Sequence, residues 1–171
     1  MNACAPGRAW TVLLSAVLLV SGCAVKRIEN GVYHSPKGYR VAIPGREWTP
    51  VDESPADLEL WHRSSPAGVA VNAVCEGAAP RRAAGVLARQ LLIGLRDRVV
   101  IERGTIQVAG QTASRTVVDG RLEDSKTSVR IETLVMKDGR CVYDFMYVAP
   151  PATFDATRAD FTRFVDSFRT E

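Results

Sequence analysis

The chain has 171 residues, of which 46% are hydrophobic, so it is long enough to form one domain with a sizeable core. Its formal net charge is only +3, and no basic patch is interleaved with aromatic residues. This charge pattern argues against a nucleic-acid partner. The sequence contains no internal repeat and no low-complexity tract, which indicates a single folded unit.

The first residues have the layout of a secretory signal. Arg8 supplies a positive charge, and the apolar run Ala9–Val20 is shorter than the roughly 20 residues that a mature transmembrane helix needs. The small residues Ser21-Gly22 then precede Cys23. We therefore expect residues 1–22 to be removed as a signal peptide. Of 171 residues, 22 would be lost and 149 would remain, and the loss of Arg8 would lower the formal charge from +3 to +2.

The segment Val20-Ser21-Gly22-Cys23 resembles the bacterial lipobox, in which the signal is cleaved before the cysteine. This resemblance implies a diacylated Cys23 sulfur and an acylated new amino group. Several acyl chains would give a durable anchor, because each buried methylene contributes about 0.8 kcal/mol. Ala24 stands where enteric lipoproteins retained in the inner membrane have aspartate, which favours the outer membrane, facing the periplasm. The alternative is an ordinary secretory signal that leaves Cys23 for a disulfide.

The rest of the chain is predicted to be a polar lipidated tether at residues 23–31, followed by one domain at residues 32–171. Period-2 alternation of apolar and polar residues predicts a series of strands in this domain. The expected strands are Tyr39–Ile43, Asp57–Arg63, Val69–Cys75, Thr105–Ala109, Thr112–Val118, Ser128–Lys137 and Cys141–Val148. The predicted turns between the last four are Gly110-Gln111, Asp119-Gly120 and Asp138-Gly139.

Two stretches have helical periodicity instead. The first is Arg81 to about Asp97, where an apolar stripe faces one side and Arg82, Arg89 and Arg96 recur on the other. We interpret these arginines as a solvated face, the alternative being contact with anionic lipid. The second is Asp155–Arg169, with Thr153 or Asp155 as its cap and a phenylalanine stripe that should dock on the sheet.

Three segments resemble the Mog/PsbP-like fold over most of Val32–Phe168. These segments are YHSPKGYRVAIPGREW, VAGQTASR and CVYDFMYVAPPATFDATRADFTRFVDSF. The resemblance implies an α+β domain, in which an antiparallel β-sheet has helices packed on both faces as an α/β/α sandwich. It implies no chemistry, since members of this fold mainly bind or assist other proteins.

With Cys4 removed and Cys23 acylated, Cys75 and Cys141 remain as a possible disulfide in an oxidising compartment. Cys75 ends one predicted strand and Cys141 begins another, as antiparallel neighbours would require. The alternative is two buried free thiols, since cysteine packs well as a small hydrophobe. Together with His34 and His62 these cysteines could in principle hold zinc. No pair has the close spacing of structural zinc motifs, so we expect no metal.

No catalytic pattern is found in the sequence. The serines at positions 64, 65, 114, 125 and 128 lie in no nucleophile-elbow motif, and GLRDRVV and VAGQTA lack the glycine spacing of a phosphate-binding loop. Asp144 has the opposite parity to Tyr143 and Phe145 in an aromatic strand. We expect it to be exposed or to face a cross-strand partner, the alternative being a functional carboxylate. We therefore expect no enzymatic activity and no cofactor.

These patterns favour a membrane-anchored envelope lipoprotein that is a non-enzymatic binding or accessory module for an unknown envelope protein. A second hypothesis is a carrier or sensor that holds a small apolar ligand between the sheet and the terminal helix. A third is a hydrolase with an unrecognised site, which would need His34 or His62 to meet an acid and a hydroxyl.

Overall fold

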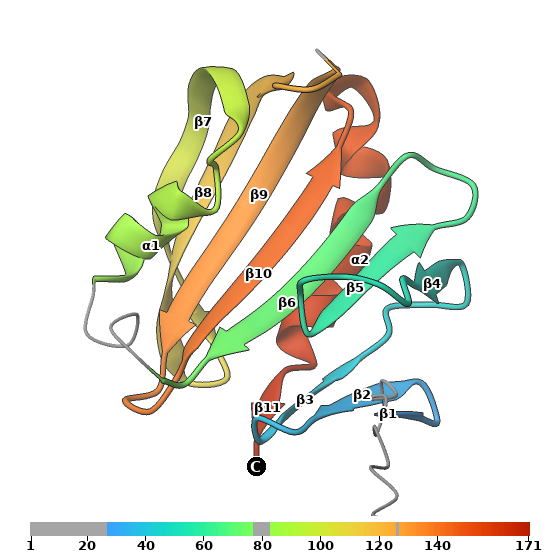
Figure 1. Ribbon diagram of the computed structural model, residues 1–171, viewed down its shortest axis with the longest axis vertical. Coiled ribbons are helices and arrows are strands. Elements are labelled where there is room, and N and C mark those ends of the chain that lie inside the picture. Colours follow the sequence, from blue (N-terminus) through green and yellow to red (C-terminus); the bar gives the residue numbers. More distant parts are fainter. Residues whose placement is uncertain (1–26, 77–82, 126) are drawn as a thin grey trace, which may run out of the picture.

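The computed structural model describes residues 27–76, 83–125 and 127–171 (Figure 1). The predicted signal peptide, the lipidation site Cys23 and the helix arginine Arg82 lie outside the described residues. Arg27–Glu29, near the end of the predicted tether, form the first strand, β1. In the part of the chain that is described, no helix is both long enough and apolar enough to cross a bilayer.

Most of the described chain forms one antiparallel sheet of seven strands in the order β4-β5-β6-β10-β9-β8-β7. Its strands are β4 (Trp48–Pro50), β5 (Leu58–His62), β6 (Gly68–Val74), β7 (Leu95–Val108), β8 (Gln111–Leu122), β9 (Ser128–Lys137) and β10 (Val142–Ala149). The predicted antiparallel sheet is thereby confirmed, and β9 has the bounds that its alternation predicts.

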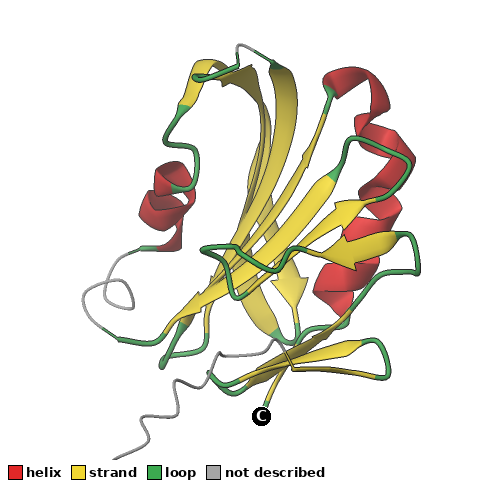
Figure 2. Ribbon diagram, turned by 45° about the vertical axis from the view of Figure 1, so that its right-hand side comes forward, coloured by secondary structure: helices red, strands yellow, loops and turns green. Residues whose placement is uncertain are grey.

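A second, smaller antiparallel sheet packs at one end of the first (Figures 1 and 2). Its strands, in spatial order, are β1, β2 (Val32–Ser35), β3 (Tyr39–Ala42) and β11 (Arg169–Thr170). The β2–β3 turn needs Gly38, which has a φ of +78°. Because β11 pairs with β3, the end of the chain lies beside Tyr39 and Arg40, at the opposite edge of this sheet from β1.

The two helices are α1 (Ala84–Gln90) and α2 (Phe154–Asp166), the latter after a 3₁₀ turn at Pro151–Thr153. The first predicted helix is therefore too long at its C-terminal end. Leu91–Gly94 form a turn, Gly94 has a φ of +89°, and Leu95 begins β7. The stripe of buried leucines misled the prediction, because a turn followed by a strand also buries Leu92 and Leu95.

Further boundaries differ from the prediction. β7 begins at Leu95 rather than at Thr105, and β8 ends at Leu122 rather than at Val118. Asp119-Gly120 is no turn but lies within β8, where a Cβ on Gly120 would lie 2.5 Å from Leu95 Cγ. This glycine therefore permits the close approach of β7 rather than a reversal of the chain. The second predicted helix ends at Asp166, and Arg169 belongs to β11. Thr153 occupies the N-cap position but makes no side-chain capping hydrogen bond.

Strand β7 forms one edge of the large sheet and is exposed from residue 96 to residue 107. Its pairing with β8 is interrupted twice by register shifts, between Arg96 and Val99 and again between Val100 and Glu102. Register shifts of this kind occur at β-bulges and other irregularities, which disrupt the ladder locally. The edge therefore presents an irregular backbone and charged side chains to solvent.

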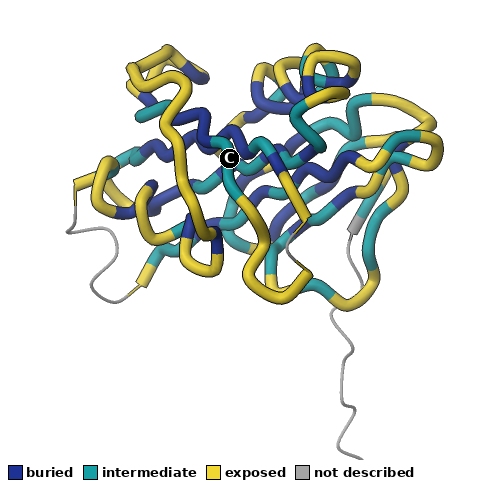
Figure 3. Tube along the Cα trace, turned by 90° about the horizontal axis from the view of Figure 1, so that it is seen from above, coloured by how far each residue is buried: buried dark blue, intermediate teal, exposed yellow. Residues whose placement is uncertain are grey.

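Side chains alternate across the central strand β10. Tyr143, Phe145 and Tyr147 are fully buried in the main core, together with Phe161 and Phe164 of α2. The even-numbered residues face the other side of the sheet. There Val142 packs with Leu87 and Ala88 of α1, whereas Met146 and Val148 pack with a second cluster around Leu92 and Leu95. Burial is greatest along these central strands and falls towards the loops (Figure 3).

Candidate functional site

The interface between α2 and the large sheet has a filled centre. The ring centroid of Phe145 lies 5.3 Å from that of Phe168 and 6.3 Å from that of Phe164. A hollow of about 250 Å³ at the β7 end of this interface is lined by charged and by apolar side chains, which are Arg115, Glu132, Arg158 and Asp166, and Ile106, Leu134, Phe161 and Val165. The hollow beside the terminal helix is therefore mixed in character, whereas the carrier hypothesis expects an apolar cavity there.

An apolar groove of about 260 Å³ lies on the even-numbered side of β10 instead. The residues that define this sheet groove are Trp61, Ala70, Leu91, Asp144, Met146 and Val148. Cross-strand pairing explains why they meet: Ala70 opposes Met146, and Gly68 opposes both Val148 and Trp61. Glu59 accepts a hydrogen bond from Trp61 Nε1 at 2.8 Å, which orients the indole as one wall of the groove.

Asp144 supplies a carboxylate in this groove, opposite Asn72 of β6 and Val135 of β9. Its Oδ1 atom is buried without a hydrogen-bond partner. Burial raises the pKa of Asp144 to about 6, because the charged form loses hydration that nothing replaces. A buried acceptor without a donor is costly, so the site suits a ligand that brings an N–H group or a cation.

Other enclosed carboxylates in the described chain have their partners. Asp57 accepts hydrogen bonds from Tyr39 Oη and the Ala73 amide, both at 2.9 Å, and so joins the small sheet to β6. Glu132 accepts from Arg115 Nε, and from Arg158 Nε at 2.9 Å, and so joins β9 to α2. Asp144 differs from both because it joins no element to another.

A second hollow, of about 400 Å³, continues the sheet groove and shares Leu91 and Met146 with it. It is formed by the turn before β7 and by the end of β8. Its rim includes Ile93, which is 79% exposed, and Leu122, which is 39% exposed. We call the two hollows together the extended groove. Its apolar surface is open to solvent from Trp61 to Ile93.

The cysteines predicted as a pair face each other at the ends of β6 and β10. Cys75 and Cys141 form a disulfide with a Cα–Cα distance of 4.0 Å. They follow directly from the neighbouring register pair, Val74 with Val142. Both sulfurs belong to the main core, on the same side of the sheet as α2.

The two histidines are not brought together with the cysteines. His34 is in the small sheet, with its Nδ1 atom 3.5 Å from Glu171, and His62 is in β5, with its ring edge against Trp48. Across residues 27–76, 83–125 and 127–171, no three or more metal-ligating side chains of His, Cys, Asp or Glu converge.

The arginines assigned to the first helix are also dispersed. Arg89 is exposed on α1, whereas Arg96 lies on β7 and donates to Glu123. Sequence reasoning identified Asp144 as a candidate carboxylate but expected it to be exposed or paired. It missed Trp61, Leu91 and Met146 as walls of a site. The one available signal was that Met146 and Val148 are apolar on the side of β10 that Asp144 faces.

No protein-family model and no curated protein matches the sequence. Several solved structures match the fold. LpqN of Mycobacterium tuberculosis, a protein involved in cell envelope biogenesis, has a TM-score of 0.62 and 12% identity over 81% of this chain and 88% of its own. Cyanobacterial PsbP (CyanoP) of Synechocystis has a TM-score of 0.59 and 14% identity over 88% and 96%.

A protein of Bacteroides thetaiotaomicron has a TM-score of 0.58 and 6% identity over 81% of this chain. The match spans about half of that protein, 47% of its length. At these identities the similarity concerns the fold alone. It confirms the expected PsbP-like fold, built mainly from antiparallel strands with two helices.

Proposed function

We propose that this chain is a non-enzymatic binding module of the cell envelope and that a partner protein binds in the extended groove. In this proposal residues 1–22 are removed, Cys23 carries the lipid anchor, and an α/β/α sandwich domain faces the periplasm from the outer membrane. The observation that carries the proposal is the unpartnered Asp144 carboxylate oxygen in an open apolar groove.

The chemistry of the groove indicates the kind of partner segment. Trp61 and Met146 are residue types that often dominate protein interfaces, because a large or adaptable apolar surface loses water on contact. Asp144 would pair with a lysine, an arginine or a backbone N–H of the partner. The partner segment is therefore apolar and carries one donor group. The Cys75–Cys141 disulfide and the fold similarity to LpqN support an envelope location.

The same groove argues against catalysis. The described residues that line the sheet groove around Asp144 include no histidine, serine or cysteine, and Ser125 belongs to the second hollow, whose lining does not include Asp144. A buried carboxylate in apolar surroundings supports binding of a donor group rather than a hydrolytic step.

Site-specific photo-crosslinking in intact cells tests the proposal. A photoreactive residue at Ile93, on the rim of the groove, should give a discrete crosslinked protein. The same residue at Arg163, on the exposed side of α2, serves as the control. Ala70→Phe should fill the groove and remove the Ile93 crosslink. Equal crosslinks from both positions, or a crosslink that persists in A70F, would contradict the proposal.

A small amphipathic amine is the second candidate for the groove. The sheet groove alone, at about 260 Å³, is close to the lower end of small-molecule pockets, roughly 300 to 1,000 Å³. Native mass spectrometry of the purified protein distinguishes the two candidates. A bound molecule that is absent from A70F would favour the carrier, whereas a ligand-free protein with an intact Ile93 crosslink would exclude it.

The anchor has its own test. Cys23→Ser should leave the precursor uncleaved by the lipoprotein signal peptidase and unlabelled by palmitate. Normal palmitate incorporation into this variant would refute acylation at Cys23 and leave the groove experiments unaffected.

A further inference from the structure

The small sheet carries basic residues in one continuous register. Backbone pairing places His34 of β2 opposite Arg40 of β3, and Arg40 opposite Arg169 of β11. Directly paired residues belong to the same face of a sheet, so these three positions form a row across three neighbouring strands. We call it the basic row.

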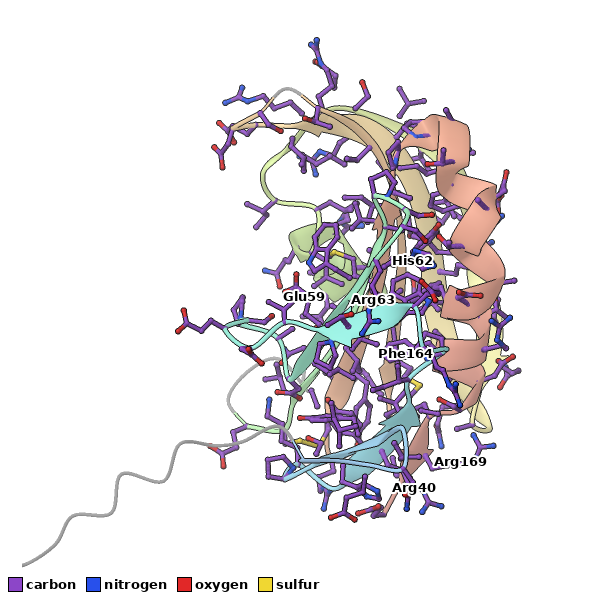
Figure 4. The ribbon with its side chains drawn as sticks, turned by 90° about the vertical axis from the view of Figure 1, so that its right-hand side faces the viewer. Arg40, Glu59, His62, Arg63, Phe164 and Arg169 are labelled. Atoms are coloured by element: carbon purple, nitrogen blue, oxygen red, sulfur yellow. A yellow bond between two sulfur atoms is a disulfide. The ribbon has the colours of Figure 1, made fainter. Side chains whose placement is uncertain are left out.

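The alternating residues of the same strands face the protein interior. Tyr33, Tyr39 and Val41 are buried in the main core. The basic row therefore lies on the outer face, where Arg40 and Arg169 are exposed. Figure 4 shows these two arginines next to each other at one end of the molecule, away from Arg63.

The two arginines have little internal compensation. Arg169 donates to the carbonyl oxygens of Asp166 and Phe168, and within the described residues no carboxylate forms an ion pair with Arg40 or Arg169. Glu171 lies 3.5 Å from His34, and Glu29 borders the same hollow of about 400 Å³. Like charges directly opposite each other destabilise a sheet, so an external anion would relieve this arrangement.

The basic row is also close in sequence to the proposed anchor. Arg27, where β1 begins, is four positions after Cys23 in the sequence. A fully extended chain gains at most about 3.6 Å per residue, so β1 lies within about 14 Å of an acylated Cys23. Lipid headgroups would then be within reach of the small sheet.

We propose that the basic row is a docking surface for the anionic headgroups of the membrane in which Cys23 is anchored. Arginine suits phosphate because its planar guanidinium donates two parallel hydrogen bonds. The location at a membrane rests on the proposed lipidation. The extended groove contains no residue of the small sheet, so docking leaves it free for a partner.

A vesicle-binding experiment tests this surface without the anchor. A chain of residues 24–171 keeps every described element and all three core clusters, whose members lie between residues 28 and 168. It should co-sediment with vesicles that contain phosphatidylglycerol but not with pure phosphatidylcholine vesicles. Binding should weaken as salt is added, because exposed charges are screened.

Neutralising the arginines should weaken this binding in steps. Arg40→Gln and Arg169→Gln should each reduce vesicle affinity about fivefold, and the double variant about thirtyfold. Arg63→Gln with Arg89→Gln changes the net charge equally on other surfaces and should reduce affinity less than about twofold. Removing like-charge repulsion should not destabilise the double variant, and circular dichroism would verify its folding.

Two results would overturn the docking surface. One is that the unmodified chain does not bind phosphatidylglycerol vesicles. This result would count against the docking surface even if the chain bound free phosphate. The other is an equal loss of affinity in the two double variants. Because the assay uses neither the acyl chains nor the groove, its failure is distinguishable from failure of the palmitate or crosslinking experiments.

Discussion

The two sides of the seven-stranded sheet differ in whether a buried carboxylate has hydrogen-bond donors. On the α2 side, Glu132 is 5% exposed and is held by Arg115 and Arg158. On the groove side, Asp144 also has a buried oxygen, but no donor reaches it. The same strand pair, β9 and β10, carries both residues. The carboxylate on the α2 side therefore joins elements of the fold, whereas Asp144 Oδ1 has no hydrogen-bond partner among the described residues.

Apolar packing differs in the same way. The α2 side is filled by aromatic rings in contact, whereas the groove side leaves Trp61 and Ile93 exposed beside a hollow. Packing to high density on one side supplies stability. The other side can then keep an open apolar surface for binding.

Neighbouring residues of β10 provide the largest test of this difference. Phe145→Ala should lower the free energy of unfolding by about 4 kcal/mol, because it leaves a cavity among buried rings. Met146→Ala, one residue later on the half-buried groove side, should cost about 1 kcal/mol. Urea unfolding of both variants measures the contrast. Equal losses would show that the two sides contribute alike.

The disulfide adds a covalent link to the filled side. Cys75 and Cys141 are 66 positions apart in the sequence, and closing such a loop stabilises a protein by about 4 kcal/mol in the chain-entropy model. Reduction of this disulfide in the chain of residues 24–171 should lower the free energy of unfolding by that amount. Two thiols titrating in the denatured, unreduced chain would show that no bond is present.

Asp144→Asn should stabilise the protein at neutral pH but not near pH 4. The pKa of Asp144 is raised from 3.8 to about 6 in the folded state, so stability falls as pH rises between these values and stays lower above pH 6. At pH 7.5 the variant should therefore be about 3 kcal/mol more stable than the unmodified chain, and near pH 4 the difference should vanish.

Glu132→Gln is the matched control for that experiment. It should destabilise the protein at pH 7.5, because Arg115 and Arg158 lose the charge they pair with. Urea midpoints at several pH values between 4 and 7.5 would measure both variants. A gain for Asp144→Asn that does not depend on pH would contradict an ionised, unpaired carboxylate.

The smallest effect is expected at the arginines first assigned to one helix. Replacing Arg82, Arg89 and Arg96 with glutamine should shift the unfolding temperature by less than about 2 °C, since Arg89 and Arg96 are exposed and exposed charges contribute little, while Arg82 lies outside the described residues. The affinity for phosphatidylglycerol vesicles should also stay unchanged. A clear loss of vesicle binding would transfer the membrane-contact role from the basic row to this surface.

Alternation of apolar and polar residues predicted strand bounds and the faces of strands, because both depend on neighbouring residues in the sequence. Alternation in β9 gave its bounds, and parity in β10 separated Tyr143 and Phe145 from Asp144. The end of the first helix could not be found in this way, because Leu92 and Leu95 satisfy helical spacing while lying on a turn and a strand.

The groove could not be predicted because its walls come from distant segments. Asp144 is buried by what lies beside it, and Trp61 and Leu91 arrive there from β5 and from the turn after α1. No periodicity within β10 contains that information. The basic row has a similar origin, since only strand pairing places Arg40 beside Arg169.

The interrupted edge strand β7 affects how readily copies of this protein could pair through their sheet edges at high local concentration. Anchored proteins are confined to two dimensions, where neighbouring copies collide often and exposed strand edges can add to one another. A regular fourteen-residue edge carrying Val99, Val100 and Ile101 would be a template for such growth. The two register shifts interrupt the row of backbone donors and acceptors, and the charges of Arg98, Glu102 and Arg103 lie along it, both of which disfavour the pairing of this edge with a second strand.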